Sequence, residues 1–148
     1  MQSQGSGIWI VATHHRLARL FSAATESAPL VEVEVIANPD ADATESELHR
    51  HDPGHSKHGD GRRTILEGQH TGRRLSDESF IDTVATRLET LRTEGVLRRL
   101  HLVAEPRMLG LLRQALSKDL ARIVESETSR DPGHDDPAAL RSALPKSL

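Results

Sequence analysis

The sequence predicts an α/β domain built on a mixed five-stranded sheet, and three observations lead to this class. Three short apolar segments, at 8–12, 17–21 and 30–36, follow one another with no room for a helix between them. Neighbouring strands so connected pair antiparallel, because parallel neighbours need a long crossover. Helix and strand patterns then alternate, which adds parallel strands through right-handed crossovers. The 148 residues are the length of one domain, which we expect to span 1–148.

The three N-terminal strands form the predicted antiparallel meander. Residues 8–12 are a compact run typical of a buried strand, and residues 13–16 form a plausible tight turn before the second strand. Residues 30–36 alternate between apolar and acidic types, which predicts two different faces. We place Val31, Val33 and Val35 on one face, and Glu32, Glu34 and Ile36 on the other.

The second half of the chain carries the crossover helices. Ser76 is a good N-cap, with acidic residues in the first turn that suit the helix dipole. One apolar face then continues until Gly95, which is placed to end the helix. Residues 100–104 predict the fourth strand, and Pro106 suits the start of the next helix. Residues 120–124, continuing more weakly to 130, predict the fifth strand, and a last short helix begins at 136–137.

A long loop at 38–75 is the unusual feature of the sequence. It has almost no apolar periodicity, and loops of this length are usually functional or disordered. Three interpretations remain open: a metal site, an anion site and a solvated loop without a partner. The metal-ligand types lie on a Gly/Pro-rich segment without helical spacing, so we expect no physiological metal. They are His49, His51, Asp52, His55 and His58.

The anion interpretation depends on glycines and cations near residue 60. Gly59 and Gly61 permit backbone conformations that turn N–H groups toward an anion, and Lys57, Arg62 and Arg63 add charge. The pattern is neither a P-loop nor a dinucleotide fingerprint. Charge segregation agrees with an anionic partner: residues 22–48 hold seven acidic and no basic residues, whereas 49–74 hold six Lys/Arg and three Asp/Glu. The same charges could also be a scattered, solvated surface.

Other features restrict the class of protein. The chain has three aromatic residues, too few for a platform that stacks nucleobases. It has no cysteine, so disulfides, thiol nucleophiles and Cys-ligated zinc are excluded. No apolar run is long enough for a membrane span or a signal-peptide core, so we expect a cytoplasmic protein. Arg107 at a predicted helix N-terminus opposes the macrodipole, which indicates either a binding role or a salt bridge to Glu105 or Asp119.

Several segments together resemble a bacterial family, the proteins required for attachment to host cells. The segments are 9–12 with Arg16, Arg19, Leu20 and Phe21; Asn38-Pro39; 52–54; 59–62; and, most specifically, Leu-Val-Ala-Glu-Pro-Arg-Met-Leu-Gly-Leu-Leu-Arg at 102–113. That family is similar in fold to the central domain of archaeal and eukaryotic class-one release factors, which is ribonuclease-H-like. The resemblance therefore implies this fold for residues 8–144.

The resemblance also implies a position for the release-factor Gly-Gly-Gln loop. Residues 57–64 look like Lys-His-Gly-Arg-Gly-Gly-Gln-Ser, keeping Lys57, His58, Gly59 and Gly61. Arg62 and Arg63 stand where the second glycine and the glutamine would be. Arginine has donors only and no amide carbonyl, so it suits phosphate contact better than positioning a water.

We therefore expect a release-factor-like, non-catalytic module associated with tRNA or ribosomal RNA, without a cofactor. The residues expected to contact nucleic acid are Lys57, His58, Gly59, Gly61, Arg62, Arg63 and Arg107. Two alternatives stay open. One is a host-attachment or protein-interaction factor. The other is a metal-dependent, nuclease-like hydrolase, against which the lack of Asp or Glu in residues 8–12 counts. The sequence leaves the oligomeric state undetermined.

Overall fold

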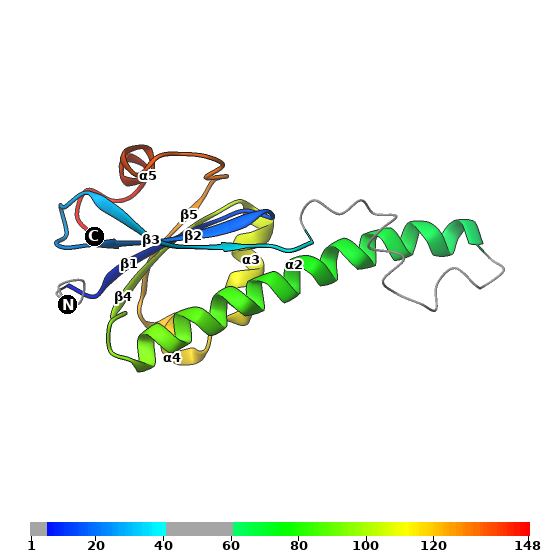
Figure 1. The fold of residues 1–148 in the computed structure, drawn as a ribbon, viewed down its shortest axis with the longest axis horizontal. Helices are drawn as coiled ribbons and strands as arrows, with labels where there is room; N and C mark the ends of the chain where they lie inside the picture. The colour runs from blue at the N-terminus through cyan, green and yellow to red at the C-terminus, as the bar shows by residue number, and fades with distance from the viewer. Residues whose placement is uncertain (1–5, 41–60) are drawn as a thin grey trace.

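The structure is a computed structural model that describes residues 6–40 and 61–148, with side chains from residue 75 onward in the second range. Its five strands are β1 (Ile8–Thr13), β2 (Leu17–Ala23), β3 (Leu30–Ala37), β4 (Arg99–Ala104) and β5 (Val124–Ser129). Its helices are α2 (Gly61–Thr93), α3 (Pro106–Ala115), α4 (Lys118–Arg122) and α5 (Pro137–Ala143). Figure 1 shows the strands as one twisted sheet with helices on both sides.

The sheet has the predicted mixed topology. Its strand order is β3-β2-β1-β4-β5. The pairs β1–β2 and β2–β3 are antiparallel, and the pairs β1–β4 and β4–β5 are parallel. The predicted α/β class, with an antiparallel meander followed by crossover connections, is therefore confirmed.

Two apolar layers explain why β1 is apolar along its whole length. Trp9 and Val11 belong to the cluster between the sheet and α2 and α3, whereas Ile8 and Ile10 belong to the cluster beneath α5. A central strand covered on both faces needs apolar residues at odd and even positions alike. All six residues of β1 are buried accordingly.

Helix α2 begins at Gly61, fifteen positions before the predicted N-cap, so the predicted loop 38–75 is wrong over residues 61–75. Ser76 and Asp77 lie within the helix and are buried. The apolar face that predicted the helix, from Phe80 to Leu91, is the part that packs on the sheet. The N-terminal part of α2 extends beyond the edge of the sheet (Figure 1), and its sequence lacks the apolar period of a helix that packs on a core.

The fifth strand also differs from its prediction. Residues 118–122 form α4, and β5 begins at Val124 and ends at Ser129. The Ser117 side chain accepts a hydrogen bond from the backbone N–H of Leu120 and so caps this short helix. The apolar residues Leu120 and Ile123 therefore pack from a helical turn, and the weaker polar pattern after Val124 is the true strand.

The predicted grouping of three valines on one face of β3 is wrong as well. The register shifts between Leu20, opposite Glu34, and Phe21, opposite Glu32, so Val33 is the extra residue of a β-bulge. Val31 then lies opposite Ser22 on the face of α2, and Val35 lies opposite Arg19 on the face of α5. A bulge moves every later residue to the other face, and the alternation of residue types alone does not reveal it.

Candidate nucleic-acid interface

In chain order, the predicted basic segment follows β3 and runs into the start of α2. Lys57, His58 and Gly59 are outside the described residues. Gly61, Arg62 and Arg63 begin helix α2 instead of belonging to a loop. The predicted anchors of this segment, the third strand and the first long helix, are confirmed by the chain path (Figure 1).

The projecting part of α2 is strongly cationic in sequence. Residues 61–74 hold four arginines, at 62, 63, 73 and 74, and one acidic residue, Glu67. The N-terminus of any helix also carries a partial positive charge, because its first N–H groups have no partners within the helix. The tip of α2 therefore combines side-chain and backbone charge of the same sign.

The β1–β2 turn fixes the point where the chain leaves β3. Asn38 donates from its side-chain amide to the carbonyl of His15 at 2.7 Å, and its backbone N–H donates to the carbonyl of Arg16 at 2.9 Å. Asp40 in turn donates its backbone N–H to the side-chain oxygen of Asn38 at 3.1 Å. These bonds hold the end of β3 against the turn, so the segment toward α2 starts from a fixed position.

His14 in this turn is buried and serves a local role. Its Nδ1 accepts a hydrogen bond from the backbone N–H of Arg16 at 3.1 Å. Burial lowers the pKa of His14, which keeps the ring neutral at neutral pH, with the remaining proton on Nε2. Nothing in the sequence around residues 13–16 separates a buried histidine from a solvated one.

An ion pair joins the base of the projecting helix to α3. Arg107 Nη2 lies 3.2 Å from Asp77 Oδ2, with 49% of the Arg107 side chain exposed and 6% of that of Asp77. The sequence suggested Glu105 or Asp119 as the partner; the structure places Glu105 at the N-cap of α3 and Asp119 beside Arg92 and Arg122. Arg107 is therefore tied to Asp77 on α2 and keeps about half of its side-chain surface open to solvent.

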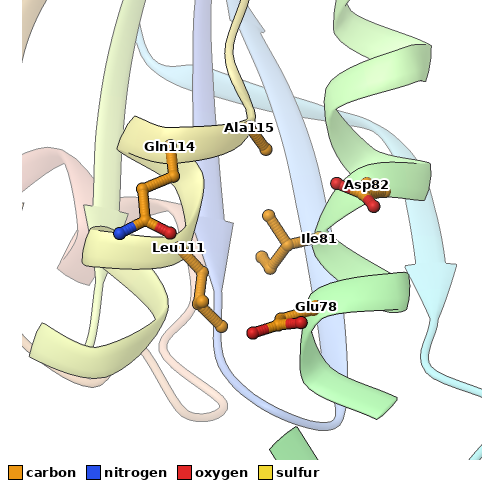
Figure 2. A pocket seen from close by; sticks show the side chains of 6 residues that line it. All are labelled: Glu78, Ile81, Asp82, Leu111, Gln114 and Ala115. Atoms are coloured by element: carbon orange, nitrogen blue, oxygen red, sulfur yellow. The ribbon is translucent and has the colours of Figure 1, made fainter. Parts of the chain in front are cut away.

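A groove of about 250 Å³ lies between α2 and α3, close to this ion pair. Figure 2 shows Glu78 and Asp82 on α2 facing Leu111 and Gln114 on α3, with Ile81 between them. Pockets for drug-sized ligands are commonly larger, about 300–1,000 Å³. The groove is therefore smaller than such a pocket, and two of its lining residues, Glu78 and Asp82, are acidic.

The described residues offer little for metal chemistry. Among them no three His, Asp or Glu side chains are grouped so that they could hold a metal ion. The five-residue set at 49–58 lies outside the described residues. In the same described part of the chain, no helix is both long enough and apolar enough to cross a membrane.

The described residues form an α/β sheet domain from which a helix of cationic sequence projects. A family model described as "Protein required for attachment to host cells" matches residues 9–144. The chain belongs to this family, as its segments predicted.

A solved structure of an archaeal translation termination factor is also similar to this chain, with 11% sequence identity and a TM-score of 0.47. The similarity covers 92% of this chain and 34% of that protein, so the chain spans about a third of its length. No curated protein matches the chain by sequence.

Proposed function

We propose that this protein is a cytoplasmic RNA-binding module that contacts tRNA or ribosomal RNA through the tip of α2. The observation that carries the proposal is the charge of the projecting segment, with four arginines against one acidic residue over 61–74. Arginine binds phosphate through a planar fork of donors, and a helix N-terminus adds a favourable field for an anion.

The proposed binding reads the phosphate backbone and not the bases. Trp9, Phe21 and Phe80 are the only aromatic residues of the chain, and their exposed fractions are 4%, 0% and 3%. None of these three residues therefore offers an exposed ring on which a nucleobase can stack. Binding through phosphates alone has low sequence preference and strong salt dependence.

The proposed module is non-catalytic. The residues at 62 and 63 are arginines, whose side chains donate hydrogen bonds but offer no acceptor to orient a water. Their role is to hold an anionic partner at the end of the helix.

The test compares two variants of the full chain with the same loss of charge. In the first, Arg62→Gln and Arg63→Gln neutralise the tip of α2. In the control, Arg98→Gln and Arg122→Gln neutralise two exposed arginines elsewhere on the surface. We expect the tip variant to bind a labelled tRNA at least about tenfold more weakly and the control to bind like the wild type. Equal losses in both variants would show that only net charge matters, and no loss in either would refute the proposal.

Sedimentation of a cell lysate tests the location and the partner. We expect the protein to travel with ribosomal particles at low salt and to leave them at high salt, because phosphate contacts are screened. A protein found on the cell surface would instead support the alternative, a host-attachment or protein-interaction factor.

A further inference from the structure

We propose that the free edge of β3 is an interface for a second copy of this chain, which joins two sheets across antiparallel β3 strands. This surface is separate from the tip of α2, so the inference does not depend on the proposed function. Among the described residues β3 pairs only with β2, which leaves its other side as an edge of the sheet (Figure 1).

The edge at β3 is apolar where the opposite edge is polar. Four large hydrophobic residues of the described chain are exposed, and three of them lie on β3: Val31 at 60%, Val33 at 50% and Val35 at 50%. The edge strand β5 is polar apart from Val124, with the sequence Val-Glu-Ser-Glu-Thr-Ser. Protein edges are commonly protected by lysine, proline, short length, other charged side chains or a bulge. Strand β3 has eight residues and neither lysine nor proline, so its protection is limited to Glu32, Glu34 and the bulge at Val33.

The charges on β3 are already neutralised within the chain. Glu34 Oε1 lies 2.9 Å from Arg87 Nε on α2, and Glu32 Oε1 lies 3.3 Å from Arg19 Nη2 on β2. Each glutamate on β3 is therefore paired with an arginine of the same chain. The β3 strand of a second copy can therefore approach this edge without meeting an unpaired glutamate.

The bulge at Val33 makes the strand complementary to itself. A two-fold axis perpendicular to the sheet leaves the α2 faces of both copies on one side and the α5 faces on the other. Two residues that lie opposite each other in the dimer must therefore be on the same face of β3. In a regular strand, residues 32 and 34 share a face and can meet as a like-charged pair. The bulge places Glu32 opposite Phe21 on the α5 face and Glu34 opposite Leu20 on the α2 face, so these glutamates cannot meet.

One register satisfies this condition for the residues on both sides of the bulge, and it places Val33 opposite Glu34 at its centre. It places residues 30, 31 and 32 opposite 37, 36 and 35 of the second copy, so that Val31 meets Ile36 on the α2 face and Glu32 meets Val35 on the α5 face. A groove of about 290 Å³ lies on the α5 side beside Glu32 and Val35, and it is also lined by Leu17, Arg19, Gly133 and His134. The occupant is therefore a second copy, because its strand supplies both the length and the matching residues.

The first experiment measures the mass of the full chain by light scattering over roughly a hundredfold range of protein concentration. We expect a monomer–dimer equilibrium that Val33→Lys shifts to monomer, because a charge at an edge strand blocks pairing. Ser129→Lys places the same charge on the exposed end of β5 and should leave the dimer intact. Circular dichroism of both variants checks that they fold. A monomer at every concentration, or a dimer that Val33→Lys leaves unchanged, overturns the proposal.

The absence of cysteine in the chain permits a direct test of the register. Glu32→Cys and Val35→Cys are prepared as separate proteins and then oxidised alone or as a mixture. The proposed register predicts a disulfide-linked dimer in the mixture and little in either protein alone, because Glu32 and Val35 of different copies lie opposite each other. Linkage of each protein only to itself would contradict the register and overturn the assignment.

Discussion

The ion pair between Arg107 and Asp77 allows a quantitative prediction about how α2 is held. Asp77 is buried and Arg107 is half-exposed. An exposed ion pair contributes about 0.2–1 kcal/mol, whereas breaking a buried pair costs about 3–5 kcal/mol, and a pair with one buried and one half-exposed partner lies between these limits. We therefore expect Arg107→Ala to lower the free energy of unfolding by about 1–2 kcal/mol. With an urea m-value of about 2 kcal/mol/M, the midpoint moves by roughly 0.5–1 M.

The assay is urea unfolding followed by the fluorescence of Trp9, the single tryptophan of the chain, which is buried in the core. A double-mutant cycle with Asp77→Asn should give a coupling energy of about 1 kcal/mol between the two residues. The matched control is Arg113→Ala, whose partner Glu127 lies at the surface, and which should cost less than about 1 kcal/mol. A coupling energy near zero would refute the claim that this pair fastens α2 to α3.

The same variants separate a structural role of Arg107 from a role in binding. If Arg107 contacts phosphate, Arg107→Ala lowers the slope of log affinity against log salt by about 0.7–0.9, whereas Asp77→Asn leaves the slope unchanged. Equal slopes for both variants would mean that Arg107 only positions the helix.

Two further predictions concern the core. Leu88→Ala removes a fully buried side chain between α2 and the sheet and should cost about 2–5 kcal/mol, measured by urea unfolding; a cost below about 1 kcal/mol would contradict the packing. Burial also lowers the pKa of His101, whose Nδ1 lies 2.6 Å from the hydroxyl of Ser126. The unfolded chain then binds the proton more tightly, so stability is full above about pH 6.5 and falls as the pH drops from there toward the lowered pKa. His101→Gln should flatten this part of the stability profile, and an unchanged profile would contradict it.

The sequence predicted the sheet well because its strands are buried. Residues 8–12 are apolar throughout and residues 100–104 are apolar except for His101, as the centre of a sheet covered on both faces requires. Their parallel pairing follows from the helix between them. The family segments at 9–12 and 102–113 agree with the family model that matches the chain.

The errors have a common physical cause, because they fall where local patterns depend on distant partners. The helix before Ser76 extends past the sheet and has no apolar period to detect. The bulge at Val33 depends on how β3 meets β2, and the partner of Arg107 comes from a helix thirty residues earlier in the chain. Local residue types cannot specify such pairings.

The salt dependence of RNA binding tests the central claim most directly. Fluorescence anisotropy of a labelled tRNA would be followed over a series of salt concentrations for the wild type and for the Arg62→Gln, Arg63→Gln variant. If the tip of α2 grips phosphates, the wild type shows a steep slope of log affinity against log salt, and the variant loses about 1.4–1.8 of it. A wild-type protein that fails to bind, or a slope that stays the same after both arginines are neutralised, would contradict the account.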